Sequence, residues 1–129
     1  MSLKKITLPH FEIGATSVFI PSESDPQMKK FIFAYKIKIK NLGAEEAQLV
    51  SRHWIITDAY GHQESVEGPG VVGLQPKITA QQIFEYESAC PLPTSTGSMR
   101  GSFSFLSRTG EPFNVEIPEF YLVSPQSVH

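Results

Sequence analysis

The sequence has a single cysteine, Cys90, among its 129 residues. One cysteine cannot form a disulfide within the chain, so the fold does not depend on internal cross-links. No apolar run approaches the roughly 20 residues needed to cross a bilayer, and Phe31 to Tyr35 is among the longest. The start, Met1 to Lys5, lacks the apolar core of a secretory signal. We therefore expect a cytosolic (cytoplasmic) protein without a membrane span.

An excess of positive charge is also missing. The chain has 11 Lys and Arg residues against 13 Asp and Glu residues, for a formal net charge of -2. Nucleic acids and anionic membranes are bound through clustered basic side chains, so we expect neither as a partner. The length suits one domain, residues 1–129, with its core over about 6–123 and a frayed polar tail over 124–129.

Apolar and polar residues alternate in several segments, which predicts β-strands. The clearest is Phe31 to Ile39, where aromatic and aliphatic side chains occupy every second position and lysines lie between them. Leu49 to Thr57 is a second strand, and its apolar residues on both faces favour the centre of a sheet, covered on both sides. Within it, Arg52 shares a face with Trp54 unless a bulge intervenes.

The remaining pattern completes an all-β fold. Alternation predicts further strands over Phe84–Cys90, Gly101–Phe105 and Phe113–Ile117. An N-terminal strand pair is expected around Ile6–Ile13 and Thr16–Ile20, while Ala44–Ala47 has helical character but is too short for a helix. About seven strands joined by short turns, such as Arg108–Pro112, predict an antiparallel two-sheet sandwich of the immunoglobulin or fibronectin type III kind. A closed barrel is the alternative.

Three glycines, Gly68, Gly70 and Gly73, have the spacing G-x-G-x-x-G. A dinucleotide site needs a buried strand before this motif and a helix after it. The preceding residues are polar and the following ones include β-branched residues and Pro76, so we reject that assignment. Two interpretations stay open: a tight turn that uses positive φ angles, or a nest of backbone N–H groups that binds phosphate. The nest would be closed by cations, for which the candidates are Arg52, Lys77 and Arg100.

Catalytic and metal-binding patterns are weak. The polar residues His53, Asp58, His62, Glu64 and Glu67 could ligate a metal, but they lack a diagnostic spacing and suit a solvated surface equally well. Cys90 alternates with aromatic residues on the expected core face, which indicates an inert thiol. No serine lies in a Gly-x-Ser-x-Gly elbow, and the acidic pairs Glu45–Glu46 and Glu85 with Glu87 look solvated.

Four segments together resemble the ApaG domain family. They are Arg52–Asp58, Val66–Pro76, Phe84–Leu92 and Gly97–Gly101. Their order extends the resemblance over about four fifths of the chain, roughly residues 13–122, and a chance match to all four is far less probable than a match to one. The resemblance implies an immunoglobulin-like or fibronectin type III-like sandwich, in agreement with the strand pattern.

The family resemblance also bears on function. It implies no established enzyme activity, and it brings genetic links to divalent-cation tolerance and a genomic association with diadenosine tetraphosphate hydrolysis. Eukaryotic relatives carry the domain inside F-box proteins and a polymerase-interacting protein. This context favours a module that binds other proteins, although a fold alone does not determine function.

We therefore expect a non-enzymatic binding or adaptor module without a cofactor or resident metal. Its contact surface is expected to join the loops of Tyr60 to Gly73 with Gly97 to Arg100, and the expected partner-binding residues are Tyr60, Pro69, Leu74 and Met99. The alternative is a sensor of phosphate, polyphosphate or dinucleoside polyphosphate, linked to divalent cations, that uses Gly68, Gly70, Gly73, Arg52 and Arg100. A metal-dependent phosphohydrolase ranks third. The identity of the protein partner and the formation of a homodimer stay open.

Overall fold

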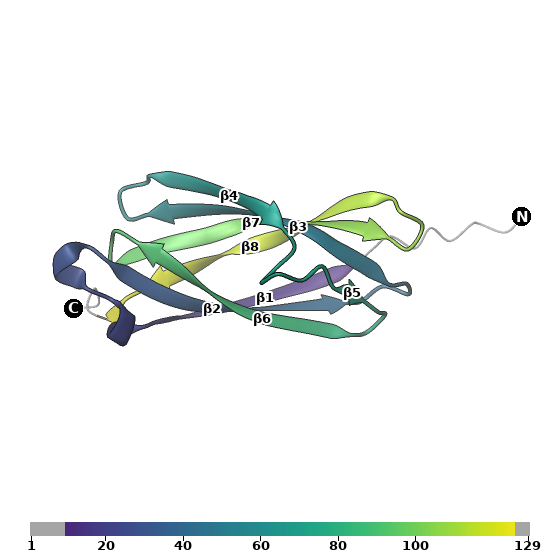
Figure 1. Cartoon of the computed structure of the whole chain (residues 1–129), viewed down its shortest axis with the longest axis horizontal. Coiled ribbons are helices and arrows are strands. Elements are labelled where there is room, and N and C mark those ends of the chain that lie inside the picture. Colours follow the sequence, from purple (N-terminus) through teal and green to yellow (C-terminus); the bar gives the residue numbers. More distant parts are fainter. Residues whose placement is uncertain (1–9, 126–129) are drawn as a thin grey trace, which may run out of the picture.

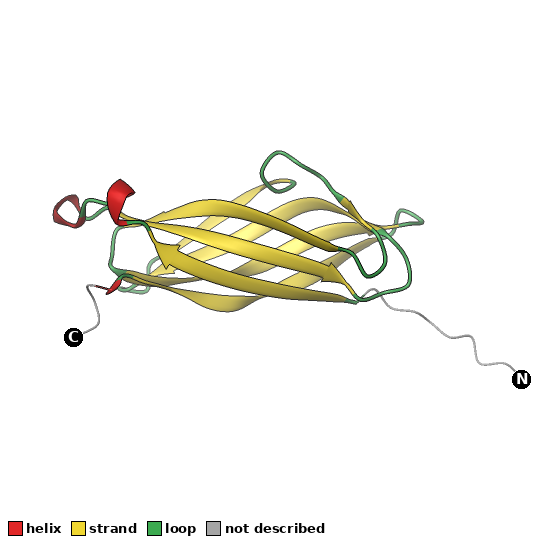
Figure 2. Ribbon diagram, turned by 90° about the horizontal axis from the view of Figure 1, so that it is seen from below, coloured by secondary structure: helices red, strands yellow, loops and turns green. Residues whose placement is uncertain are grey.

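The computed structural model of the chain describes residues 10–125. These residues form two antiparallel β-sheets that face each other (Figure 1, Figure 2). The strands are β1 (Phe11–Phe19), β2 (Phe31–Asn41), β3 (Ala47–Asp58), β4 (Gln63–Pro69), β5 (Lys77–Ile78), β6 (Ile83–Leu92), β7 (Thr96–Ser107) and β8 (Pro112–Val123). Two single-turn 3-10 helices, η1 (Pro21–Glu23) and η2 (Pro26–Met28), connect β1 to β2. The predicted all-β two-sheet sandwich is confirmed, whereas the finer assignment to the immunoglobulin or fibronectin type III class stays a prediction.

One sheet has the strand order β1-β2-β6, and the other has the order β4-β3-β7-β8 with β5 also paired to β3. β1 and β8 approach each other along one side of the sandwich, where the Ser17 hydroxyl donates to the carbonyl oxygen of Tyr121 at 2.8 Å. On the other side, β4 and β6 are the edge strands. β3 therefore lies inside its sheet, as its sequence predicts.

The core is built mainly from aromatic residues. Along β2, Phe33, Ile37 and Ile39 are fully buried, while the intervening lysines face the opposite side of the sheet. The ring of Trp54 meets Tyr35 of the other sheet edge-on, with ring centroids 5.5 Å apart. It also packs edge-on against two rings of its own sheet, Phe103 and Phe120. Trp54 thus packs against aromatic rings of both sheets.

The opposite face of β3 is not covered. His53 and Ile55 are only half-buried, because none of residues 10–125 forms a third layer on this side of the five-stranded sheet. The expectation that β3 is covered on both faces was therefore wrong. A register shift between Leu49 and Ser51 precedes Arg52, which stays on the Trp54 face and pairs with Phe103.

One further expectation about local structure was wrong, and another, that Ala44–Ala47 is too short for a helix, was confirmed. The predicted N-terminal pair is one continuous strand in the described residues: β1 pairs with β2 from Phe11 to Phe19, and Gly14 lies in its middle, opposite Lys38. Residues 6–9 of the expected pair lie outside the described range. The segment with helical character is a bend that leads directly into β3, since Ala47 is buried as the first residue of that strand.

The sequence pattern did not predict β4, because its residues do not alternate between buried and exposed positions. Nearly all of its residues are exposed, whichever face they point to. Its residues instead follow the register of β3, from Ser51 opposite Pro69 to Thr57 opposite Gln63. Only the pairing with β3 makes this polar segment a strand.

The C-terminal tail begins later than expected. Ser124 is fully buried, and its N–H donates to the carbonyl oxygen of Ser95 at 2.9 Å. The chain is therefore held in place at Ser124, one residue beyond β8. Residues 126–129 of the predicted frayed tail lie outside the described range.

Asn41, at the end of β2, has a polar side chain that is buried, with 1% of the residue's surface exposed. Its Nδ2 group donates to the carbonyl oxygens of Glu45 and Ile78 at 2.8 and 2.9 Å. Its Oδ1 accepts the N–H of Gly43 at 2.9 Å. A single side chain thus joins β2, the turn before β3, and β5.

Replacing Asn41 by alanine is expected to lower the free energy of unfolding by about 2–3 kcal/mol, because buried carbonyl and amide groups lose their partners. Urea unfolding monitored by tryptophan fluorescence measures the change. The control Asn114→Ala, at an exposed position of β8, is expected to change stability by less than about 0.5 kcal/mol. Equal losses in the two variants would contradict the role of Asn41.

Candidate functional site

The glycine motif lies where β4 ends. The Nη1 group of Arg52 donates to the carbonyl oxygens of Pro69 and Gly70, both at 3.0 Å. Its guanidinium lies directly over Gly68, where even a Cβ atom would crowd it. Arg52 is therefore committed to the carbonyl groups of this loop.

The last part of the motif is a tight turn from Val71 to Leu74. Val72 and Gly73 have φ angles of 44° and 80°, the signs required at the two central positions of a type I′ turn. Positive φ is unusual for a β-branched residue, which makes Val72 a strained position. The N–H groups of Gly70, Val71 and Leu74 already donate to backbone carbonyl oxygens at 2.7 to 2.9 Å. This geometry favours the turn over a nest of N–H groups that point at an anion.

The candidate cations do not gather around the loop. Arg52 projects on the inner side of the sheet, whereas Arg100 pairs with Ile55 on its outer side. Lys77 lies in β5, opposite Gln48. Of the three, only Arg52 contacts the glycine motif through a hydrogen bond.

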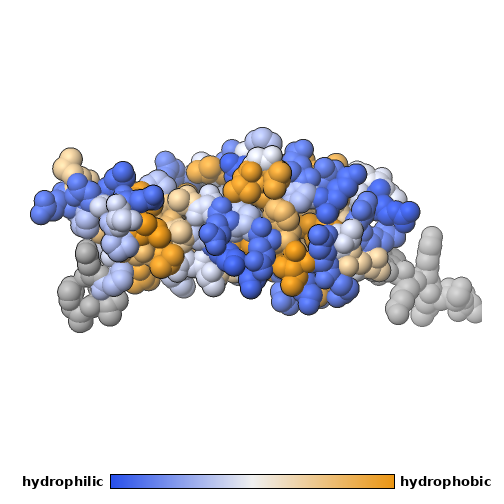
Figure 3. Space-filling model, turned by 60° about the horizontal axis from the view of Figure 1, so that its bottom comes forward, coloured by the Kyte–Doolittle hydropathy of each residue, from blue (hydrophilic) through white to orange (hydrophobic). Residues whose placement is uncertain are grey.

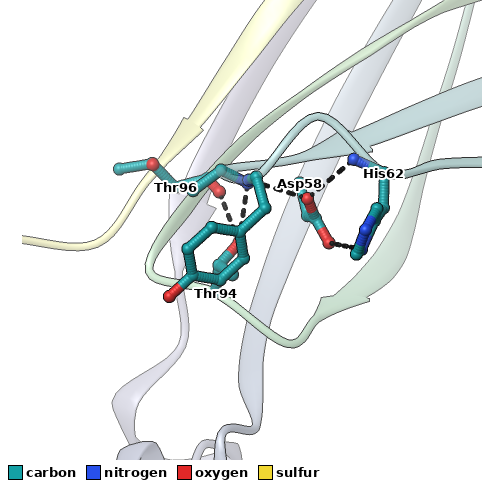
Figure 4. Close-up of polar contacts among 6 residues, drawn as sticks. Asp58, His62, Thr94 and Thr96 are labelled. Carbon is teal, nitrogen blue, oxygen red and sulfur yellow. Dashed lines mark hydrogen bonds and ion pairs between the residues drawn. The ribbon is translucent and has the colours of Figure 1, made fainter.

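At the other end of β4, Tyr60 lies in the turn between β3 and β4 (Figure 1). Its side chain is 82% exposed. Asp58, whose side chain is only 9% exposed, holds this turn: its Oδ1 accepts the N–H groups of Tyr60 and His62 at 2.8 and 3.0 Å, and its Oδ2 lies 3.6 Å from the His62 ring (Figure 4). An exposed aromatic side chain is thus presented on an ordered turn.

The connection between β6 and β7 braces the same turn. The hydroxyl of Thr94 accepts the N–H of Ala59 at 3.1 Å and donates to the carbonyl oxygen of Thr96 at 2.8 Å (Figure 4). Next to this turn lies a hollow of about 290 Å³. Its lining consists of Thr57, Asp58, Ala59, Thr96, Gly97, Ser98, Tyr121 and Val123. We call Tyr60 together with this hollow the tip surface.

The structure divides the surface expected from the sequence. Tyr60 and Gly97 do lie together, because Asp58 pairs with Gly97. The glycine motif lies at the opposite end of β4, about 20 Å away for a seven-residue strand. Of the other expected partner-binding residues, Pro69 and Leu74 are exposed at that far end, and Met99 is buried with 1% exposure, so it cannot be a surface contact.

The tip surface also contains residues that the sequence did not indicate. Tyr121 and Val123 of β8 are 66% and 47% exposed. An extra residue in β8, between the partners of Met99 and Gly101, shifts the alternation so that Tyr121 faces outward. On the face that Figure 3 shows, apolar patches are separated by hydrophilic ones.

The edge strands carry residues that oppose strand addition. β4 presents Glu64 and Glu67 and ends at Pro69, and β6 has Glu87 and Pro91 at exposed positions. Charges and prolines on edge strands disfavour pairing with another chain. A homodimer through β4 would bring like charges together, so the loops are better candidates for a contact surface.

The candidate metal-binding and catalytic residues do not form a recognisable centre within the part of the chain that the structure describes. Among residues 10–125, no group of three or more His, Cys, Asp or Glu side chains could hold a metal ion. A hydrogen bond from Lys36 lowers the pKa of Glu85, which keeps this carboxylate ionised and unsuited to donate a proton. Burial raises the pKa of the Cys90 thiol to about 11, and nearby Glu64 adds to the rise. A protonated, buried thiol is a poor nucleophile.

Comparisons with known proteins point to one family. The family model described as the ApaG domain matches residues 21–107. The chain is 58% identical to Protein ApaG of Bdellovibrio bacteriovorus over 127 residues, which cover 98% of this chain and 100% of that protein. It is 44% identical to Protein ApaG of Bordetella pertussis over 117 residues, which cover 91% of this chain and 89% of that protein.

A solved structure gives the same result. The crystal structure of an ApaA protein from Bordetella pertussis superposes with a TM-score of 0.89 at 42% identity, covering 95% of this chain and 99% of that one. Within the described residues, no helix is long and apolar enough to span a membrane.

Replacing Val72 by asparagine is expected to raise the free energy of unfolding by about 1 kcal/mol, because asparagine tolerates positive φ and valine does not. Thermal and urea unfolding measure the change. The matched control is Leu74→Asn, which removes a similarly exposed apolar side chain from the same turn at a residue without positive φ. If both variants shift stability equally, strain at Val72 is not the cause.

Cys90 is expected to resist alkylation by iodoacetamide at pH 8 in the folded protein and to react fully in urea. Its folded-state pKa of about 11 lies above the value of about 8.5 for an exposed thiol. The buried thiol therefore stabilises the fold fully below about pH 8.5, and this contribution is lost as the pH rises through about 11. Cys90→Ala should have a shallower loss of stability in this window. Equal alkylation rates in the folded and unfolded protein would contradict this expectation.

Proposed function

The chain belongs to the ApaG domain family, and on that premise we propose that it is a non-catalytic module that binds another protein through the tip surface. The observation that carries the proposal is the presentation of Tyr60: its side chain is 82% exposed, yet its turn is fixed by Asp58 and Thr94. Aromatic residues dominate protein interfaces, and a side chain that is already positioned loses less conformational entropy on binding.

The hollow beside Tyr60 supports the same proposal. Its lining includes the exposed side chains of Tyr121 and Val123, so an apolar residue of a partner would find both depth and apolar contact there. The phosphate-sensor alternative gains no support of this kind, since three N–H groups of the glycine loop are already bonded and Arg52 binds its carbonyl oxygens.

The proposal includes a cytoplasmic location. Cys90 is the only cysteine of the chain, and its buried thiol suits a reducing compartment.

Tyr60→Ala is expected to weaken capture of the protein partner about tenfold, the effect of losing one aromatic anchor, while the free energy of unfolding stays unchanged. Immobilised wild-type and variant proteins are incubated with lysate of the source organism, and each captured protein is quantified by mass spectrometry.

The matched control is Leu74→Ala, an exposed apolar residue at the far end of β4. Partners that bind through the tip surface should be retained by this variant and lost by Tyr60→Ala. If every captured protein is retained by Tyr60→Ala, the tip surface is not the binding surface.

A further inference from the structure

The outer face of the five-stranded sheet has further hollows beyond the tip surface. One, of about 340 Å³, is lined by Arg100, Glu116 and Glu119 among others. A second, of about 500 Å³, shares His53 and Ser102 with the first. The hollow of the tip surface adjoins the first, because Ser98 in its lining donates to Glu119 at 3.2 Å. We call these three hollows the trough.

The strand register arranges the outward side chains of the trough in rows. The first row contains Thr57, Ser98 and Tyr121, the second contains Ile55 and Arg100, and the third contains His53, Ser102 and Glu116. Successive rows are two residues apart, which is about 6.5–7 Å along a strand. An extended chain that lies along the trough places its own residues i, i+2 and i+4 over the three rows, because its side chains alternate with the same period.

The β7 residues that line the trough are small, apart from Arg100. Along β7, Ser98, Gly101 and Ser102 line the hollows, while Glu116 and Glu119 of β8 form part of the wall. The space above these small residues can therefore receive side chains of a bound segment.

Two charged side chains of the trough, Arg100 and Glu116, have no ion-pair partner among the described residues. No carboxylate lies within 4.0 Å of the Arg100 guanidinium, and no cation lies within that distance of Glu116. Glu119 keeps its negative charge, and its two oxygens accept hydrogen bonds from the first-row side chains Ser98 and Tyr121, which hold the carboxylate toward that row. The second row thus offers the positive charge of Arg100, and the third row offers the negative charge of Glu116, next to Glu67, which lies 3.6 Å from the ring of His53.

We propose that the trough binds an extended segment of a partner protein whose residues i, i+2 and i+4 are apolar, acidic and basic. The apolar residue occupies the hollow of the tip surface, against Tyr121 and Val123. The acidic residue faces Arg100, and the basic residue faces Glu116. This inference rests on the proposed function and adds the chemistry of the partner.

Charge complementarity selects this occupant. A uniformly basic segment would place a cation on Arg100, and a uniformly acidic one would place a carboxylate on Glu116; like charges in contact disfavour such complexes. The order apolar, acidic, basic, read from the tip surface, pairs both charges.

Two synthetic peptides of equal composition test the order of the charges. The matched peptide is acetyl-Thr-Phe-Thr-Asp-Thr-Lys-Thr-amide, and in the swapped peptide the aspartate and the lysine exchange places. Each is titrated into the isotope-labelled full chain while amide chemical shifts are recorded. We expect saturable shifts along β3, β7 and β8 with the matched peptide, and about fivefold weaker binding of the swapped peptide, the effect of two mispaired exposed charges.

Charge reversal in the protein provides the second arm. The double variant Arg100→Glu/Glu116→Arg is expected to prefer the swapped peptide by a similar factor. The variant exchanges the two charges of the protein, and the swapped peptide exchanges the two charges of the ligand, so opposite charges face each other again. The control Glu12→Arg, at an exposed position of β1 in the other sheet, is expected to bind like the wild type. Amide spectra without peptide confirm that each variant is folded.

Two outcomes of the peptide titrations would overturn the proposal. One is equal binding of the two peptides by the wild type, and the other is the absence of shifts in the trough up to about 5 mM peptide, well above the dissociation constant of a specific weak complex. Shifts in the trough that depend on protein concentration alone would assign it to a second copy of this chain and would also overturn it. If the peptides fail while Tyr60→Ala still loses partners from the lysate, the binding module stands and only its partner chemistry is wrong.

Discussion

The packing of Trp54 between the two sheets is the contact on which the rest of the structure depends. Its ring touches Tyr35 of one sheet and the rings of Phe103 and Phe120 in the other. Opposite Trp54, β7 approaches so closely that a Cβ atom on Gly101 would collide with the carbonyl oxygen of His53. This close approach holds β3 and β7 in a fixed register, and β3 leads into the turn of Tyr60 while both strands form the floor of the trough.

The glycine motif shows how a local pattern can have a structural origin. Gly70 has a φ of 61°, and a Cβ atom there would collide with the carbonyl oxygen of Leu74. Gly68 leaves room for the guanidinium of Arg52, which binds the carbonyl groups that the turn exposes. The glycines and the arginine thus serve one purpose, which is to close the loop between β4 and β5 against the sheet.

The surfaces that we propose for binding lie where the regular alternation of the strands is interrupted. The extra residue in β8 near Pro118 places Glu119 and Tyr121 on the outer face, and the missing layer over β3 leaves His53 and Ile55 half-exposed. Neither feature contributes to the core. A surface that the fold does not require is free to be shaped by binding, which is why we place both proposals there.

Alternation of side chains was enough to predict β2, β6, the middle of β7 and the first half of β8. One face of each strand is buried, so apolar and polar residues alternate along it with a period of two. Alternation failed for β4, which is polar on both faces, and for Tyr121, because a bulge inverts the phase of the pattern.

The sequence by itself determined the all-β sandwich, the core face of β2 and the family, since these depend on local periodicity and on short motifs. Only the tertiary structure decided that Met99 is buried, that Arg52 binds a loop 17 residues away, and that Tyr121 lies beside the turn between β3 and β4. The physical reason is that these facts depend on which strands become neighbours, and strand pairing joins residues far apart in the chain.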